Sequence, residues 1–140
     1  MYAEKQGEPC VTICGKVQEE IAQLDAESQQ EFLTEWGLDE LGLDKIVRAG
    51  YQVLDLITFF TANENEAHAW TVSQGTTVQR AAGKIHTDFE TGFIKAEVIK
   101  YNILTKIGSE KEVKKQGLME VHGKNYIVED GDLIFFQAHH

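Results

Sequence analysis

Residues 57–72, which read ITFFTANENEAHAWTV, decide the fold of the chain. Residues 57–61 and 68–72 are short runs rich in β-branched and aromatic side chains, and the polar segment 62–66 separates them. Two such runs around a polar turn are typical of an antiparallel hairpin. We therefore expect a β-sheet to begin near Ile57.

The segments after this hairpin alternate between helical and extended patterns. Thr77 precedes an apolar stripe, which predicts a threonine N-cap and a helix carrying Val78, Ala81, Ala82 and Ile85. The pattern then predicts a strand over 93–101, a lysine-rich helix over 102–116 ended by Gly117, and closing strands over 118–121, 126–128 and 133–136. Because one short helix and one sheet face can bury each other, this order predicts an α+β, β-grasp (ubiquitin-like) domain over residues 55–140.

Residues 1–54 show a different pattern. Cys10-Val11-Thr12-Ile13-Cys14 is a β-branched run that predicts a strand. Apolar residues then recur at helical intervals over 17–36, with a break near Asp25, and Gly37 ends this helix. A second, shorter helix is predicted over 43–54. We expect residues 1–54 to form a separate part of the chain.

Length and charge limit the class of protein. The 140 residues leave room for one compact domain, or for one domain and a fragment of another. The net charge of −10 argues against a surface built mainly to bind nucleic-acid phosphates, and we expect no DNA partner. No apolar run approaches the roughly 20 residues that cross a bilayer, and the N-terminal residues lack the apolar core of a secretory signal. We expect a cytoplasmic protein without a membrane partner.

A phosphate-binding loop is the first catalytic feature to consider, because Gly-Lys occurs at Gly15-Lys16, Gly83-Lys84 and Gly123-Lys124. Such a loop needs another glycine five residues before the first residue of this pair, and Ser or Thr after the lysine. All three candidates fail at both positions. The serines also lie outside any Gly-x-Ser-x-Gly elbow. The sequence therefore predicts no catalytic residue.

The cysteines and histidines do not form a metal-ligand pattern. In a strand, Cys10 and Cys14 lie ~13 Å apart, beyond the ~7 Å between Cα atoms that a disulfide allows, so we expect two reduced thiols. The histidines show neither close Cys/His spacing nor the His-Glu-x-x-His pattern: His68, His86, His122, His139 and His140. Asp130-Gly131-Asp132 indicates a β-turn rather than a calcium loop. We expect no metal site.

A local basic face is a candidate for binding RNA. Its cations and rings for stacking are Arg80, Lys84, Lys95, Lys100, Trp70 and His86. The predicted later helix adds Lys106, Lys111, Lys114 and Lys115. The alternative interpretation is that these lysines form an ordinary solvated face and that the aromatic rings belong to the core. His86-Thr87-Asp88 supplies an imidazole and a carboxylate, and their favoured role is to tie down the loop between helix and strand.

Seven short sequence motifs follow one another between residues 59 and 132. They are Phe59-Phe60-Thr61-Ala62, Ala69-Trp70-Thr71, Gly75-Thr76, Ala81-Ala82-Gly83, Ile85-His86-Thr87-Asp88-Phe89, Gly92-Phe93-Ile94-Lys95-Ala96-Glu97-Val98 and Asp130-Gly131-Asp132. In order and spacing this series closely resembles the C-terminal end of the YchF family, the Obg-like P-loop ATPases and GTPases. The resemblance implies that residues 55–140 are the TGS domain of that family, a β-grasp module.

The resemblance extends into the first part of the chain. Gly42-Leu43-Asp44-Lys45-Ile46 is similar to the segment that joins the nucleotide-binding domain of the family to its TGS domain. Residues 1–54 would then be the C-terminal remnant of that P-loop domain with its connecting helices. Cys14, Gly15 and Lys16 match the base-contacting loop, where the family usually reads Ser-Ala-Lys. The Walker A loop and switch regions of the family lie upstream of Met1.

The resemblance implies a function for the chain. Full-length family members use ATP or GTP with magnesium, hydrolyse ATP in preference to GTP, associate with ribosomes and act in translation. This chain is therefore expected to be a C-terminal fragment that is not an enzyme and holds no cofactor of its own, with a TGS domain that binds the ribosome or structured RNA. Two alternatives stay open: the chain completes an ATPase in trans, or it is a structural module that forms homodimers through its N-terminal segment.

Overall fold

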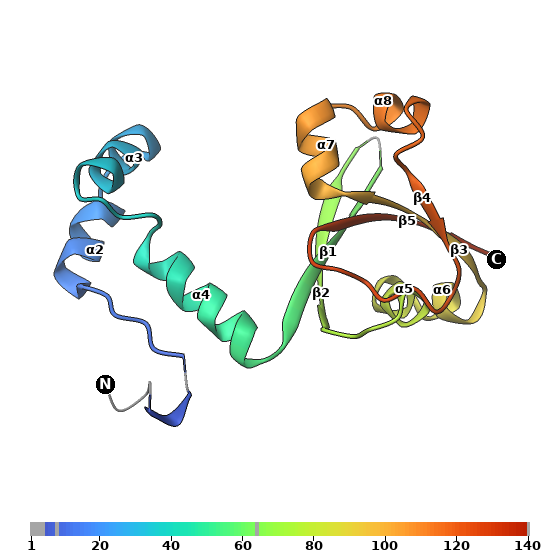
Figure 1. Cartoon of the computed structure of the whole chain (residues 1–140), viewed down its shortest axis with the longest axis horizontal. Coiled ribbons are helices and arrows are strands. Elements are labelled where there is room, and N and C mark those ends of the chain that lie inside the picture. The colour runs from blue at the N-terminus through green and yellow to red at the C-terminus, as the bar shows by residue number, and fades with distance from the viewer. Residues whose placement is uncertain (1–4, 8, 64, 140) are drawn as a thin grey trace. The chain divides into compact units, whose positions relative to one another are not determined.

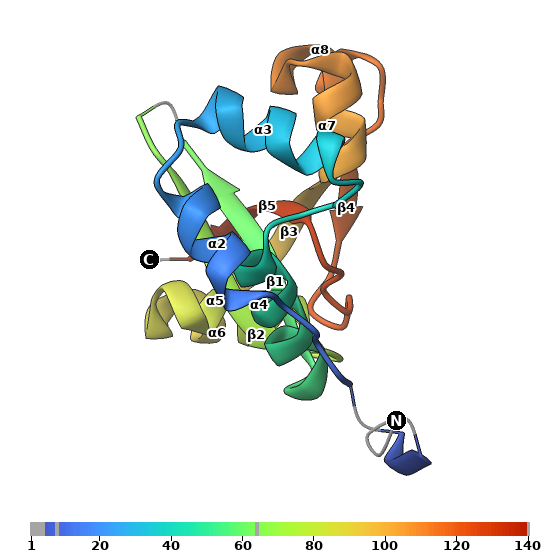
Figure 2. The same cartoon turned by 90° about the vertical axis from the view of Figure 1, so that its left-hand side faces the viewer.

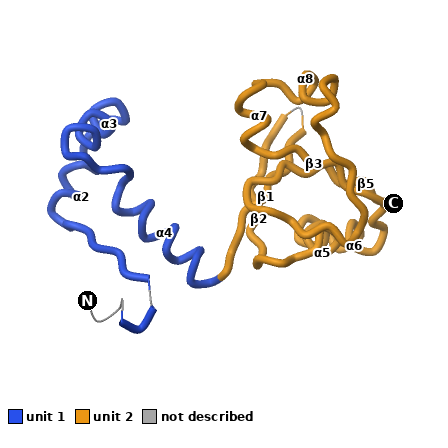
Figure 3. Tube along the Cα trace, in the orientation of Figure 1, with its two compact units in different colours: residues 1–54 blue, residues 55–140 orange. Residues whose placement is uncertain are grey.

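The computed structural model describes residues 5–7, 9–63 and 65–139. His140, one of the histidines considered above, and part of the N-terminal segment searched for a signal lie outside these residues. The chain divides into two compact units, residues 1–54 and residues 55–140 (Figure 3).

The first unit is helical. Its helices are α2 (Gly15–Ala22), α3 (Ala26–Glu35) and α4 (Gly42–Val53). The break near Asp25 is confirmed, because the Asp25 carboxylate caps α3 by accepting a hydrogen bond of 2.9 Å from the Ser28 N–H. This hydrogen bond holds the pKa of Asp25 below its usual value. Gly37 follows α3 with a φ of +61°, and the Leu38 N–H donates to the Leu33 carbonyl, so the predicted glycine stop is also confirmed.

The predicted strand over Cys10 to Cys14 is wrong. Residues 9–14 have no regular secondary structure, and α2 begins directly after Cys14. A β-branched run becomes a strand only when a neighbouring strand accepts its backbone hydrogen bonds. The described residues of the first unit include no other strand, so the propensity of this run has nothing to pair with.

The second unit is built on one five-stranded mixed sheet. Its strands are β1 (Leu56–Ala62), β2 (Ala67–Ser73), β3 (Phe93–Lys100), β4 (Glu120–His122) and β5 (Asp132–Ala138). They lie in the order β2-β1-β5-β3-β4, in which β1 and β5 are parallel and the other neighbours antiparallel. The predicted α+β class and the hairpin after Ile57 are confirmed.

Helices cover the two faces of this sheet. α5 (Val78–Ile85) and α6 (Thr87–Thr91) lie on one side, and α7 (Tyr101–Ile107) and α8 (Glu110–Lys115) on the other (Figures 1 and 2). The larger core cluster packs α5 against the sheet and comprises Phe59, Val72, Val78, Ala81, Ala96, Val98, Val128 and Ile134. The smaller cluster lies under α7 and α8 and centres on Ile99, Val113 and Leu133. Successive side chains of a strand therefore point into different core clusters, because side chains alternate between the two faces of a pleated strand.

The structure corrects the predictions for the C-terminal segments. The helix predicted over 102–116 is two helices, because Gly108 takes a left-handed φ of +76° and ends α7. The strand predicted over 126–128 is reduced to an isolated bridge between Ile127 and Thr77. The strand predicted over 118–121 begins later, at Glu120. Thr77 is the N-cap of α5, but its side chain makes no capping hydrogen bond.

Candidate binding surfaces

A groove runs beside β2, the edge strand of the sheet. Its volume is ≈ 490 Å³, and its lining residues are Leu56, Thr71, Val72, Ser73, Thr76, Arg80, Gly83, Lys84 and Glu90. Arg80 and Lys84 are four residues apart on α5, so they lie on the same side of that helix. Both are exposed, whereas Val78, Ala81 and Ala82 are buried against the sheet. The structure therefore brings together two of the predicted RNA-binding cations.

Trp70 and His86 have structural roles in the second unit. Trp70 is half-buried, packs against the larger core cluster, and its indole N–H donates to the Thr61 hydroxyl at 2.9 Å. His86 is the N-cap of α6, and its Nδ1 accepts a hydrogen bond of 3.2 Å from the Asp88 N–H. These contacts agree with the interpretations that the tryptophan belongs to the core and that His86 ties down the loop.

Lys100 is held in a network of hydrogen bonds. Its Nζ lies 2.8 Å from Asp132 Oδ1, from Glu129 Oε2 and from the Tyr126 hydroxyl. Asp132 is fully buried, and its second oxygen accepts from the Tyr126 hydroxyl and the Glu129 N–H. The ring of His122 stacks on Tyr126, with 3.9 Å between ring centroids.

These contacts explain the pKa values in the network. Burial alone lowers the pKa of Lys100, but its hydrogen bonds to Asp132, Glu129 and Tyr126 outweigh burial and raise that pKa overall. Burial also raises the pKa of Tyr126 to about 12, and Asp132 shifts it in the same direction. The network ties the end of β3 to β5 and leaves Lys100 with its donors occupied.

Lys95 lies on the other face of β3 from Lys100. Its Nζ is 3.4 Å from Glu97 Oε1, and Lys114 of α8 approaches the second oxygen of the same carboxylate at 3.7 Å. The predicted RNA-binding residues thus occupy three separate places. Arg80 and Lys84 line the groove, and Lys95 lies on the face of the sheet under α8. The other three, Trp70, His86 and Lys100, are engaged in contacts within the sheet and its loops. The predicted residues do not form one surface.

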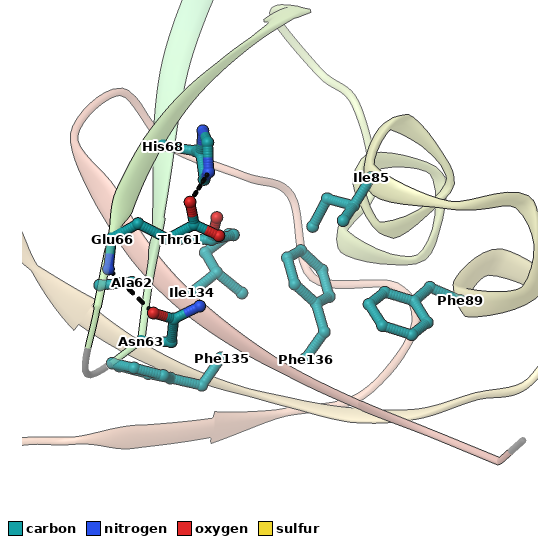
Figure 4. A pocket seen from close by; sticks show the side chains of 10 residues that line it. All are labelled: Thr61, Ala62, Asn63, Glu66, His68, Ile85, Phe89, Ile134, Phe135 and Phe136. Atoms are coloured by element: carbon teal, nitrogen blue, oxygen red, sulfur yellow. Dashed lines mark hydrogen bonds and ion pairs between the residues drawn. The ribbon is translucent and has the colours of Figure 1, made fainter.

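A smaller hollow of ≈ 260 Å³ opens at the end of the first hairpin (Figure 4). Apolar side chains, among them Ile85, Phe89 and Phe136, line one side of it, and polar groups lie at the other (Figure 4). The Asn63 side chain accepts from the Glu66 N–H at 2.9 Å, and Glu66 pairs with His68 at 3.2 Å. Asn63, Glu66 and His68 are therefore engaged in polar contacts within the hairpin.

Cys14, Gly15 and Lys16 lie at the start of α2 in the first unit, where all three are exposed. A Cβ on Gly15 would meet no atom within 4 Å, so nothing in this unit requires a glycine there. Cys14 lines a hollow of ≈ 270 Å³ together with Trp36, Leu38 and other residues of the unit. A second, apolar hollow of ≈ 500 Å³ is lined by Ile13, Ile21, Leu43 and Ile46 among others.

The described residues contain no group of three or more His, Cys, Asp or Glu side chains placed to hold a metal ion. No helix among them is both long enough and apolar enough to span a membrane.

Sequence reasoning missed the partners of these side chains. Asp132 and Glu129 follow Lys100 by 32 and 29 residues, and only the fold brings them to it. The Asp130-Gly131-Asp132 turn was the one visible signal, since an acid in a tight turn often accepts backbone hydrogen bonds. Glu90 and the hydroxyl groups of the groove gave no sequence signal.

Together these features define an α+β fold, with one mixed sheet among the described residues and a groove beside its β2 edge. The family YchF-GTPase_C, whose description reads "Protein of unknown function (DUF933)", matches residues 56–139. The chain belongs to the YchF family of Obg-like ATPases.

Known relatives are similar over nearly all of the chain. The ribosome-binding ATPase YchF of Haemophilus influenzae is 47% identical over 135 residues, which cover 96% of this chain and 37% of that protein. Obg-like ATPase 1 of Gallus gallus is 47% identical over 127 residues, covering 91% of this chain and 32% of that protein. The solved YchF GTPase of Schizosaccharomyces pombe matches with a TM-score of 0.73 and 34% identity, covering 85% of this chain and 31% of that one. The chain thus spans about a third of the length of these relatives.

Proposed function

We propose that the chain is the C-terminal, non-catalytic binding module of a YchF-type translation-associated ATPase that acts on ribosomes in the cytoplasm. The observation that carries this proposal is the similarity of almost the whole chain to the last part of proteins named ribosome-binding ATPases.

Residues 55–140 fit a β-grasp TGS domain. The strand order β2-β1-β5-β3-β4, with β1 and β5 parallel at the centre, supports this assignment. So does α5, which follows the first hairpin and packs on the sheet through Val78 and Ala81. On this proposal residues 1–54 are the end of the nucleotide-binding domain and its connecting helices.

The proposal assigns no nucleotide hydrolysis to this chain. ATP or GTP with magnesium would bind the part of the relatives that these residues do not match. Cys14, Gly15 and Lys16 would contribute only a base contact to such a site, from the start of α2. Calorimetric titration with magnesium ATP should therefore show no binding in the micromolar range, and tight binding would contradict this assignment.

We assign the ribosome contact to the lysines that lie on β3 and α8 of the second unit. Lys95 and Lys114 approach each other around Glu97, and Lys111 and Lys115 lie on the same short helix. Clustered lysines bind RNA phosphates with an affinity that falls as salt rises. Lys100 is excluded from this surface because its ammonium is engaged with Asp132 and Glu129.

Cosedimentation of the chain with ribosomal subunits tests this function. Binding should weaken as salt rises and should be lost in Lys95→Glu/Lys114→Glu. Lys124→Glu changes the same charge in the turn before Tyr126 and should keep most of the binding. Absence of binding at low salt would count against the proposal, and equal loss in both variants would count against the assigned surface.

A second candidate function rests on the apolar surface of the first unit. Trp36, Leu43 and Leu54 are each more than half exposed, at 59%, 67% and 65%. Exposed apolar side chains gathered in one small unit are typical of a surface that another chain or domain covers. If the chain completes an ATPase in trans, the N-terminal part of a relative should hydrolyse ATP faster after it is mixed with this chain. Homodimer formation would give a doubled mass in sedimentation equilibrium, which Leu43→Glu should abolish.

A further inference from the structure

The outer edge of β2 presents backbone N–H and C=O groups that do not pair with β1. At the two ends of its pairing with β1, the Asn63 N–H donates to the Glu66 carbonyl and the Gln74 N–H donates to the Asp55 carbonyl. Hydrogen-bonded and non-hydrogen-bonded pairs alternate along an antiparallel ladder. In the observed register, Ala67 and Ala69 therefore fall on non-hydrogen-bonded pairs, and their N–H and C=O groups point away from β1.

This edge is accessible. Ala67 and Ala69 are exposed, and β2 is the terminal strand of the sheet. Small side chains at these positions leave the backbone unshielded, and an exposed strand edge pairs readily with another extended segment. Among the described residues, β2 carries none of the Lys, Pro or bulge features that commonly block such an edge.

The groove next to this edge has a definite charge. Arg80 and Lys84 line it from α5, and neither forms an ion pair within the described part of the chain. Lys95, Lys100 and Lys114, in contrast, each lie within 4.0 Å of a carboxylate. The hydroxyl groups of Ser73 and Thr76 line the same groove. An incoming strand would thus meet backbone partners along β2 and two cations along α5.

We propose that the β2 edge and the groove beside α5 bind an extended acidic segment of a partner protein by adding a strand to the sheet. The backbone groups of Ala67 and Ala69 supply the pairing, and Arg80 and Lys84 select carboxylates on the side of the segment that faces α5. This inference goes beyond ribosome binding and does not depend on it.

The groove fits a peptide better than RNA. Recognition of single-stranded RNA relies on aromatic rings that stack with bases. Of the two aromatic rings of β2, Trp70 donates to Thr61 and packs against the core, and His68 pairs with Glu66. None of the described residues that line the groove is aromatic. Strand addition, in contrast, needs only the backbone edge and the neighbouring side chains that are present.

Substitution of Glu90 should change the affinity for an acidic segment in the opposite direction to substitution of Arg80 and Lys84. Its carboxylate lines the groove and lies so close to Gly83 that a Cβ at that position would overlap it. A carboxylate in the groove opposes the binding of an acidic segment. Glu90→Gln should therefore tighten binding about twofold to threefold, whereas a groove that bound cations would lose affinity.

Fluorescence polarisation of the full chain with a labelled peptide in which glutamate alternates with valine provides the measurement. Side chains alternate between the two faces of a strand, so all the glutamates of this probe face one side. Binding should weaken at least about tenfold in Arg80→Glu/Lys84→Glu and as salt rises. A matched peptide with glutamine for glutamate should bind more weakly, and Lys106→Glu, which changes a charge on α7, should have little effect.

The backbone part of the proposal is tested separately. Ala69→Pro removes one outward N–H at a position where an edge strand tolerates proline, and it should weaken peptide binding. N-methylation of the peptide backbone tests the same hydrogen bonds without altering the protein, so a misfolded variant leaves the test intact. Amide chemical shifts of Ala67 and Ala69 should move on titration.

Three results would overturn the inference. Binding that is unchanged by the Arg80/Lys84 reversal would remove the groove as the site. Insensitivity to N-methylation would remove strand addition. Tighter binding of a short single-stranded RNA than of the acidic peptide, lost in the same double variant, would make the groove a nucleic-acid site instead. None of these measurements uses ribosomes, so this inference and the proposed ribosome contact can fail independently.

Discussion

The ammonium group of Lys100 lies 2.8 Å from the carboxylate of Asp132, and Asp132 is fully buried. The two residues face each other across the pairing of β3 and β5, so their ion pair closes one end of that ladder. Tyr126 and Glu129 complete the set of hydrogen bonds around the buried carboxylate. Each oxygen of the buried carboxylate therefore accepts at least one hydrogen bond, which offsets the cost of burying its charge.

Removing either charge should destabilise the second unit. Lys100→Met and Asp132→Asn should each lower the free energy of unfolding by about 2 kcal/mol, because each leaves its partner buried with fewer compensating contacts. The double variant should lose at least about 1 kcal/mol less than the sum of the two single variants. Urea unfolding of all four proteins measures this coupling.

Lys95→Met is the matched control for that cycle. Lys95 pairs with Glu97 at 3.4 Å on a side chain that is 38% exposed, so its loss should cost less than about 1 kcal/mol. Strict additivity of the Lys100 and Asp132 changes would contradict the view that these two residues stabilise the fold as a pair.

Stability should fall at high pH because of the same network. The folded pKa of Tyr126, about 12, lies above its unfolded value of about 10, so the native state holds the proton longer. The stabilisation is complete below about pH 10 and disappears as the pH rises toward 12. The raised pKa of Lys100 acts in the same direction. Urea unfolding between about pH 9 and pH 12 should show this decline.

Tyr126→Phe separates the tyrosine from other groups that titrate in that range. This variant should be less stable at neutral pH, and its stability should decline less steeply at high pH. Absorbance titration should also show a late tyrosine ionisation in the wild-type chain that the variant loses. Equal slopes for the two proteins would assign the alkaline loss to other side chains.

The elements that the sequence predicts correctly are those whose signal is local. The β-branched and aromatic runs within residues 57–72 predict β1 and β2, and the small apolar stripe after Thr77 predicts α5, because each signal lies within the segment itself. The incorrect predictions concern features that the local pattern does not record, namely what a segment pairs with and which backbone conformation a glycine adopts. Cys10 to Cys14 have the composition of a strand but no neighbour to pair with, and Gly108 divides a continuous helical pattern by adopting a left-handed conformation.

The same distinction applies to the candidate sites. Arg80 and Lys84 could be placed together from sequence, since residues four apart share a helix face. Lys100 has the same appearance in the sequence as Lys84, yet its ammonium is committed to Glu129 and Asp132. A substitution of Lys100 is therefore a test of stability and an unsuitable control for RNA binding.

Gly92 should be intolerant of a side chain. A Cβ at this position would collide with the backbone carbonyl of His139, while the His139 N–H donates to the Gly92 carbonyl at 2.8 Å. Since backbone atoms cannot swing aside, Gly92→Ala should lower the free energy of unfolding by about 1–3 kcal/mol. Gly123→Ala is the control, because a Cβ at Gly123 meets nothing within 4 Å and should change stability by less than about 0.5 kcal/mol. Thermal unfolding of both variants measures the difference, and similar losses would remove the close approach as the cause.

Residues 55–140 should fold without the first unit. Every residue of the two hydrophobic clusters lies in this range, whereas the large apolar side chains that are buried among the described residues of the first unit are only Ile21 and Leu33. A fragment of residues 55–140 should therefore unfold cooperatively, and one of residues 1–54 should be largely unfolded in isolation. The two tryptophans make the comparison direct, because Trp36 belongs to the first unit and Trp70 to the second. In the full chain carrying Trp36→Phe, the fluorescence of Trp70 should follow the same urea transition as the fragment. A fragment that aggregates, or that unfolds at much lower urea, would show that the sheet needs the preceding helices for its stability.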